Sequence, residues 1–237
     1  MNKKLYSRLD DHLFLAKKTN RLITTHFLDE NQLELAKIYL KNNFYQVSTT
    51  PINAKRKIIG FNGDPNDLIV CLVAKYQNNF INLKYRDVYG ALMGLNLSPE
   101  VIGDINVFDD KVAIYILDKV KDDILYNLIQ INKIYLKFEI SEEHYYKENA
   151  FLDYQDIISS LRLDCVVKSF AKVSRSHAND LIKQQYVKIN HLVVDKATTI
   201  VKENDIISIR RSGRYIFDGV IKQTKKDKLL IQYRKYD

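Results

Sequence analysis

Apolar residues recur with helical spacing from residue 160 onward. The first such stretch has apolar positions at i, i+3, i+4 and i+7, filled by Leu163, Val166, Val167 and Phe170. This spacing predicts an amphipathic helix over residues 160–171, with Ser159 or Ser160 as its N-terminal cap. A second predicted helix is capped by Ser174 and buries Ala178, Leu181 and Ile182. The helical pattern ends at Gln184 and Gln185.

The periodicity then changes from helical to alternating. Apolar and polar residues alternate over residues 187–190, which is typical of a strand with one face in water. Residues 192–194 can return as its hairpin partner. We therefore expect residues 158–237 to pack two short helices against a small, twisted, mostly antiparallel sheet.

The N-terminal pattern is also helical. Residues 3–41 predict two helices, the first with a face of Leu9, Leu13 and Ala16, and the second beginning at Asp29 and Glu30. The pattern stops around Pro51, and residues 57–61 predict a strand. A dense cluster of turn residues at 62–67 suggests a domain boundary.

The next stretch predicts the order βαββαβ, which is that of a ferredoxin-like sandwich. Its expected elements are a strand at 67–76, a helix at 87–95, strands at 105–108 and 111–117, a helix at 121–131 and a strand at 133–140. Many RNA-binding domains of this topology stack bases on exposed strand aromatics. Tyr76, Tyr115 and Tyr135 are the candidates here, although packing is the commoner role of such residues.

The expected fold class is therefore α+β, divided into four segments. These are a mainly helical N-terminal domain at 1–66, a ferredoxin-like middle domain at 67–141, a connector with some helix at 142–157, and the helix–sheet module at 158–237. The longest apolar run, residues 68–74, is far shorter than the roughly 18 residues of a membrane-spanning helix. Cys71 and Cys165 lie in separate apolar runs and suggest neither a disulfide framework nor a metal site. We expect a soluble, cytoplasmic and monomeric protein.

The formal net charge of +8 is concentrated in the last third of the chain. Residues 158–237 hold 17 Lys and Arg against 8 Asp and Glu, whereas residues 1–157 hold 20 against 21. A local excess of this kind favours a polyanion such as RNA. The candidate RNA-binding residues are Arg162, Lys172, Ser174, Arg175, Ser176, Lys183, Lys188, Asn190, Arg210, Arg211 and Arg214.

Arg175 has a particular place among these candidates. It stands in the first turn of the second predicted helix, where backbone amides and the helix dipole favour a phosphate. We expect its guanidinium and the amides after Ser174 to share one phosphate. For any single cation a solvated surface position is the simpler interpretation, and phosphate binding is favoured for the set.

The C-terminal segment resembles a known RNA-binding module. The pattern Arg162-Leu163-Asp164, Ser174-Arg175-Ser176, Leu181-Ile182, Val187-Lys188-Ile189-Asn190 and then Gly213 is similar to the module of small-subunit ribosomal protein S-four. The family usually has glycine where this chain has Gln185. A left-handed non-glycine residue costs about 1 kcal/mol, so we expect the turn at Gln185 to be rebuilt locally.

A second resemblance lies in the middle segment. Residues 87–95 and 101–105 are similar to the signature of the bacterial YlmH family, which joins an N-terminal helical region and a middle domain to an S-four-like module. Family members commonly carry a Lys-Arg pair in the loop where this chain has Asn96 to Glu100. We interpret Gly90 and Gly94, four residues apart, as a site of close helix packing.

Three features resemble catalytic or metal sites. Arg162-Leu163-Asp164 echoes a string of pseudouridine synthases, and residues 172–176 resemble a loop of class I aminoacyl-tRNA synthetases, but neither has the partner domain that those enzymes need. The five histidines are scattered without metal-ligand spacing. We expect no catalytic residues, no cofactor and no metal. Asp164 is expected to face the first turn of its own helix.

These observations favour a non-enzymatic protein that binds structured RNA. The YlmH resemblance implies rRNA or tRNA on the large ribosomal subunit, in rescue or quality control of stalled translation, with no membrane partner and no DNA specificity. The alternative is a cell-division-linked adaptor that binds proteins, and an RNA-modifying enzyme is the third hypothesis.

Overall fold

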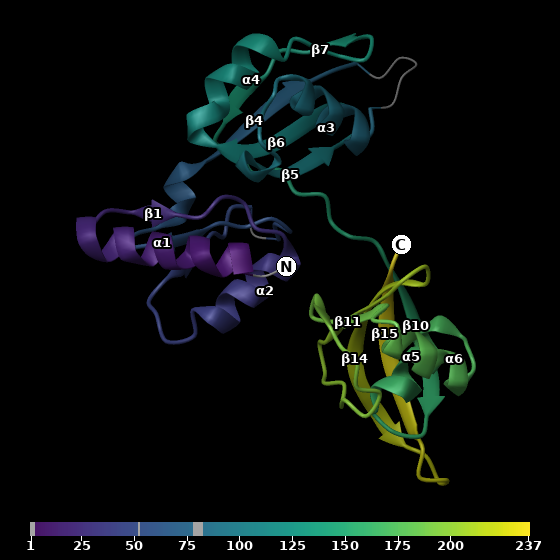
Figure 1. Ribbon diagram of the computed structural model, residues 1–237. Coiled ribbons are helices and arrows are strands. Elements are labelled where there is room, and N and C mark those ends of the chain that lie inside the picture. The colour runs from purple at the N-terminus through teal and green to yellow at the C-terminus, as the bar shows by residue number, and fades with distance from the viewer. Residues whose placement is uncertain (1–2, 52, 78–82) are drawn as a thin grey trace. The chain divides into compact units, whose positions relative to one another are not determined.

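The computed structural model describes residues 3–51, 53–77 and 83–237. The chain forms two compact units, Met1–Lys147 and Glu148–Asp237 (Figure 1). The first unit contains both the N-terminal and the middle segments that we predicted. The hydrophobic cluster of the middle segment also includes Phe27 and Ile58 of the N-terminal segment, and the domain limits near residue 66 stay a prediction.

The N-terminal part packs two helices against a small sheet. Its elements are α1 (Lys3–Thr19), β1 (Ile23–Thr24), α2 (Glu30–Tyr39), β2 (Gln46–Val47) and β3 (Ile59–Phe61), with the antiparallel strand order β1-β3-β2. Leu9 and Ala16 of α1 are buried, as the helical spacing predicts. Asp29 caps α2 by accepting a hydrogen bond from the backbone N–H of Gln32 at 2.8 Å.

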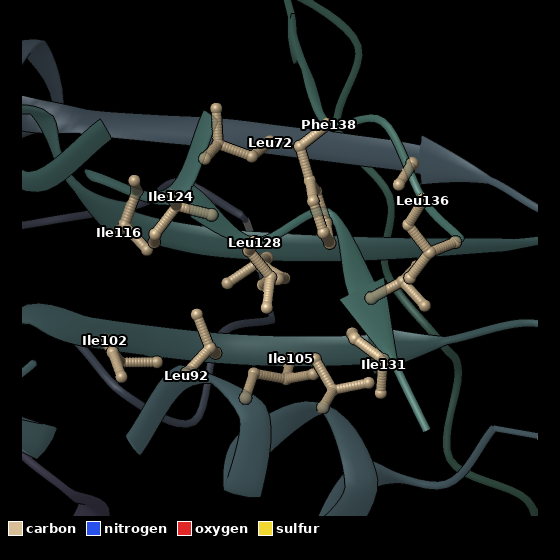
Figure 2. Close-up of a cluster of buried hydrophobic side chains, with 14 of the residues drawn as sticks. Leu72, Leu92, Ile102, Ile105, Ile116, Ile124, Leu128, Ile131, Leu136 and Phe138 are labelled. Carbon is tan, nitrogen blue, oxygen red and sulfur yellow. The ribbon is translucent and has the colours of Figure 1, made fainter. Parts of the chain in front are cut away.

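The middle part builds a four-stranded antiparallel sheet. Its main elements are β4 (Ile69–Lys75), α3 (Tyr85–Gly94), β5 (Ile102–Val107), β6 (Lys111–Leu117), α4 (Lys121–Asn127) and β9 (Glu139–Ser141). The strand order β5-β6-β4-β9, with α3 and α4 as crossovers, is the order of a ferredoxin-like βαββαβ sandwich. Leu92 of α3 and Ile124 of α4 belong to the same buried cluster as Leu72 and Ile116 of the sheet (Figure 2).

The predicted helix at 121–131 is shorter than expected. It ends at Asn127, and a small hairpin of β7 (Gln130–Ile131) and β8 (Ile134–Tyr135) replaces its last turn and the start of the predicted strand at 133–140. Asn132 occupies the left-handed region in the hairpin turn, with φ 54°. Asparagine tolerates this conformation better than most residues, which explains why the chain turns here.

The sheet face away from α3 and α4 is covered by the chain itself. Tyr115 is fully buried, its hydroxyl donates to the carbonyl of Tyr145 at 3.0 Å, and it accepts from the Tyr145 N–H at 2.8 Å. Tyr76 is also buried and donates to the Phe108 carbonyl at 2.6 Å. Tyr135 is 77% exposed but lies on the β8 hairpin, outside the main sheet. Base stacking on Tyr76 and Tyr115 is therefore blocked in this conformation.

The glycines of α3 do not mark close helix packing. A Cβ built at Gly90 or at Gly94 meets no atom within 4 Å, so both positions face open space. Our interpretation of this pair was wrong. The loop after α3 is held instead by Glu100, whose carboxylate accepts from Arg8 at 2.6 Å.

The predicted connector contains a strand and no helix. Phe151–Ile158 forms β10, which pairs along its whole length with β15 (Leu229–Tyr236). The expectation of helix at 142–157 was wrong, because backbone pairing over eight residues with a distant strand outweighs the local pattern. The residues before it, up to Lys147, belong to the first unit.

The C-terminal unit packs two helices on one antiparallel sheet of six strands. The remaining elements are α5 (Leu163–Ala171), α6 (Arg175–Lys183), β11 (Val187–Ile189), β12 (Leu192–Val193), β13 (Ile206–Ile209) and β14 (Gly213–Gln223). The strand order is β10-β15-β14-β13-β11-β12. Phe170 of α5 stacks on Tyr233 of β15, with ring centroids 4.1 Å apart, in the centre of the core.

Helix α5 begins later than the serine pattern predicts. Its N-cap is Arg162, and neither Ser159 nor Ser160 caps it. The first helical amides are satisfied by a distant loop instead, because Leu163 and Asp164 donate their N–H groups to the carbonyls of Thr199 and Ala197. Ser174, by contrast, caps α6 as predicted, by accepting from the N–H of His177 at 3.1 Å.

The turn after α6 keeps the left-handed conformation at Gln185. Its φ is 60°, so the turn keeps the conformation that glycine usually adopts there. Our expectation that the turn would be rebuilt around Gln185 was wrong.

The neighbouring Gln184 has φ −78°. We predict that Gln185→Gly raises the free energy of unfolding by about 0.5–1 kcal/mol, because glycine relieves the left-handed strain. Gln184→Gly is the matched control and should lower it by a similar amount. Thermal unfolding followed by circular dichroism tests both, and destabilisation by Gln185→Gly would contradict the prediction.

Candidate nucleic-acid interface

Two predicted RNA-binding arginines hold one buried carboxylate. Arg162 lies at the N-cap of α5 and donates to the two carboxylate oxygens of Asp164 at 3.1 and 3.2 Å. Arg175, the first residue of α6, donates to Oδ2 of the same carboxylate through Nε at 3.1 Å and through Nη2 at 2.9 Å. The Asp164 side chain is only 2% exposed. These contacts tie the start of α6 to the start of α5, and we call the three residues the Asp164 clamp.

The clamp keeps its carboxylate ionised. Burial alone would raise the pKa of Asp164, but the hydrogen bonds from Arg162 and Arg175 outweigh it and lower the pKa to about 2. The carboxylate also accepts from the backbone N–H of Cys165 at 3.0 Å, so it does face the first turn of its own helix. Asp164 is therefore a structural anion that orients two helices.

This geometry changes the role of Arg175. We expected its guanidinium to be available for a phosphate at the start of α6, and the structure shows that the same group binds Asp164. Its side chain is nevertheless 57% exposed, so part of the guanidinium meets solvent. Arg162 is in the same position with 38% exposure. Both arginines can contact RNA only through the guanidinium N–H groups that do not donate to Asp164.

Lys172 and Asn190 also have structural partners. Lys172 ends α5 in the left-handed region with φ 54°, and its ammonium lies 2.9 Å from the carboxylate of Asp156 on β10. Asn190 donates its side-chain amide to Asp205 at 2.7 Å and accepts from the N–H of Ile206 at 2.9 Å. The Asn190 amide group therefore joins the end of β11 to the start of β13. These two hydrogen bonds account for an asparagine at position 190 without an RNA ligand.

Lys188 and Arg214 lie on the far face of the sheet. Lys188 pairs with Ser208, and Ser208 pairs with Arg214, so the three side chains form one row across β11, β13 and β14. The neighbouring row contains Val187 and Ile209, which are buried in the core beneath the helices. Because side chains alternate along a strand, Lys188 and Arg214 point away from α5 and α6.

The remaining candidates lie at exposed positions on α6 and at the end of β13. Ser176 and Lys183 are exposed on α6 itself, and Arg210 and Arg211 are exposed where β13 ends. The N–H of Arg210 donates to the carbonyl of Tyr186 at 3.0 Å, which brings the two segments side by side. Its guanidinium lies over the Tyr186 ring, 4.5 Å from the centroid. Tyr186 was not among the predicted residues, because a lone aromatic after a helix carries no distinctive spacing.

The predicted residues therefore divide into two groups. Arg162, Lys172, Ser174, Arg175, Asn190 and Arg214 make structural contacts, the last by placing its guanidinium 5.5 Å from the centroid of the Tyr236 ring. Ser176, Lys183, Lys188, Arg210 and Arg211 present polar or charged groups to solvent. Asp156 and Asp164 are the acidic partners of Lys172, Arg162 and Arg175 in the first group. The structural unit begins at residue 148, so it also contains Glu148, Asp153 and Asp156. It holds 17 Lys and Arg against 11 Asp and Glu and is therefore still basic.

Comparisons with known proteins match both parts of this arrangement. A family model described as a putative RNA-binding domain in YlmH matches residues 66–145, and an S4 domain model matches residues 161–207. The ribosome-associated protein quality control protein P2 of Bacillus subtilis is 31% identical over 164 residues, which cover 68% of this chain and 63% of that protein.

A solved structure supports the fold. The cell division protein YlmH from Streptococcus pneumoniae aligns with a TM-score of 0.51 and 17% identity, over 59% of this chain and 90% of that one. In the part of the chain that the structure covers, no helix has the length and apolarity to cross a membrane. The chain is thus a YlmH-like protein, in which the putative RNA-binding domain of YlmH is followed by a C-terminal S4 domain.

Proposed function

We propose that this protein is a non-enzymatic RNA-binding protein that acts on the rRNA or tRNA of the large ribosomal subunit. The observation that carries the proposal is the set of exposed cations on α6, on β11 and at the end of β13, in the unit that matches the S4 domain. Lys183 and Arg211 extend from segments that the backbone places together, and Lys188 lies on the adjoining strand β11 with its side chain on the face of the sheet away from α6. Cations arranged in this way bind the phosphates of a structured RNA without reading its sequence.

The ribosomal setting rests on the relative. The Bacillus subtilis protein bears the name of a ribosome-associated quality control protein, and it aligns over 68% of this chain. A role in rescue or quality control of stalled translation is the natural extension of that name to this chain. The S4 domain would then hold RNA, and the first unit would contact tRNA or protein.

The clamp supports a binding role over a catalytic one. Asp164 is the acidic residue that resembles the catalytic string of pseudouridine synthases, and its pKa of about 2 makes it a weak base near neutral pH. Both of its oxygens accept hydrogen bonds from arginines. Within residues 3–51, 53–77 and 83–237, no three His, Cys, Asp or Glu side chains gather as a metal site would need.

Sedimentation tests the proposal. The tagged full chain, expressed in a bacterial host, should migrate with 50S particles on a sucrose gradient at moderate salt. At high salt it should leave them, because phosphate contacts weaken as counterions compete. Ribonuclease digestion before the gradient is the control and should also release it. Migration as free protein at both salt concentrations would contradict the proposal and favour the protein-binding adaptor.

A further inference from the structure

A half-open pocket of about 420 Å³ lies in the C-terminal unit beside the exposed cations. One wall is a single face of α6, where His177, Leu181 and Gln184 follow at i, i+4 and i+7. Ala171 and Val173 contribute from the end of α5. The opposite side is formed by Tyr186, Ile209, Arg210, Arg211 and Ser212. The volume is in the range of pockets that hold small planar ligands.

The aromatic side of the pocket is built by backbone pairing. Val187 pairs with Ile209, and the Arg210 N–H donates to the Tyr186 carbonyl, so the two side chains start from adjacent positions. The guanidinium of Arg210 then lies over the Tyr186 ring at 4.5 Å. A tyrosine ring paired with a planar guanidinium offers the flat surface on which nucleobases stack.

The lining also has the charge and polarity that a nucleotide requires. Arg210 and Arg211 are the charged residues of the pocket, and no carboxylate lines it. Leu181 and Ile209 give an apolar floor, while His177 and Gln184 bring groups that can hydrogen-bond to the edge of a base. Arg211, which is exposed and lines the pocket, supplies a positive charge for the phosphate attached to the bound base.

We propose that this pocket binds an unpaired nucleobase of RNA, stacked against the Tyr186–Arg210 pair. The inference rests on the proposed function and goes further, because phosphate contacts alone cannot distinguish paired from unpaired RNA. A base that is extruded from a bulge or a loop can enter the pocket, whereas a base inside a duplex cannot. The protein would therefore favour RNA that has an unpaired base next to a helix.

The test uses two RNA hairpins and the full chain. One hairpin carries a single bulged 2-aminopurine, and the other has an abasic ribose at the same bulge. The parent protein should bind the first about 5- to 20-fold more tightly, as base–aromatic stacking predicts. The fluorescence of 2-aminopurine should also fall on binding, because stacking quenches it.

Tyr186→Leu separates the pocket from the charge. This variant keeps an apolar side chain and should reduce the preference to less than about twofold while its affinity for the abasic hairpin stays unchanged. Tyr186→Phe should retain the preference, and Tyr154→Leu, at a partly exposed tyrosine on β10, is the matched control that should also retain it.

Each outcome separates the two proposals. Equal affinity of the parent for both hairpins, or unchanged 2-aminopurine fluorescence, would overturn the pocket and leave RNA binding intact. Loss of affinity for both hairpins in Tyr186→Leu, with the preference kept, would also overturn it. Failure of the parent to bind either hairpin at low salt would overturn the RNA-binding function and the pocket with it.

Discussion

Asp164→Asn is expected to lower the free energy of unfolding of the unit at 148–237 by about 2–4 kcal/mol at neutral pH. The variant replaces a buried anion that accepts hydrogen bonds from Arg162 and Arg175 with a neutral amide. The lowering of the pKa of Asp164 from 3.8 to about 2 corresponds to on the order of 2 kcal/mol of stabilisation of the ionised form in the folded state. Hydrogen exchange of the α5 and α6 amides measures this unit separately from the rest of the chain.

The effect should depend on pH in one direction. A carboxyl group whose pKa is lowered by folding contributes stability that is fully present above its unfolded pKa of 3.8. That contribution disappears as the pH falls through the folded pKa of about 2. The difference in unfolding free energy between the parent and Asp164→Asn should therefore be constant from neutral pH to about 5 and shrink between about 4 and 2.

Asp195→Asn is the matched control for this prediction. Asp195 is exposed, and within the described residues it has no hydrogen-bond or ion-pair partner, so its replacement should change the unfolding free energy by less than about 0.5 kcal/mol. If Asp164→Asn and Asp195→Asn destabilised the unit equally, the clamp would not hold α5 and α6 together. A difference that stayed the same down to pH 2 would contradict the pKa assignment.

Replacing Lys183, Lys188 and Arg211 together with glutamine is expected to weaken RNA binding by on the order of 100-fold. We assign about 1 kcal/mol to each exposed phosphate contact, and three such losses give that factor. All three residues are exposed, and in the part of the chain that the structure describes none forms an ion pair. Folding should therefore survive, and the binding of a labelled rRNA fragment by fluorescence anisotropy measures the effect directly.

The control removes the same charge from the other unit. Lys17, Lys18 and Lys41 are exposed on or just after the helices of the N-terminal part, and their replacement by glutamine should change the RNA affinity by less than about threefold. Equal losses from the two triple variants would mean that net charge, and not the positions of Lys183, Lys188 and Arg211, determines binding.

The elements that the sequence predicted best are those set by local periodicity. Helix α6 begins and ends within a residue of the predicted positions. Ser174 caps its start, and its apolar face stops at the glutamines after its end. Strand β6 occupies the predicted residues 111–117, because a nearly continuous apolar run begins directly after the turn at residues 109–110. In both cases the local pattern and the tertiary contacts favour the same structure.

The parts that the sequence did not predict depend on distant partners. Strand β10 exists because β15, more than seventy residues later, pairs with it. Arg162 and Arg175 resemble free cations in the sequence, and only the fold brings both to the same carboxylate. The pocket beside Tyr186 likewise needs the meeting of α6 with the end of β13, which no local spacing reveals.

The salt dependence of RNA affinity tests the central claim most directly. For the full chain and a structured rRNA fragment, the logarithm of the binding constant should fall linearly with the logarithm of the salt concentration, by about 0.7 to 0.9 per phosphate contact. The variant without Lys183, Lys188 and Arg211 should have a slope that is shallower by about 2 to 3, while the variant without Lys17, Lys18 and Lys41 keeps the parental slope. A parental slope near zero, or an unchanged slope in the first variant, would contradict phosphate binding by Lys183, Lys188 and Arg211.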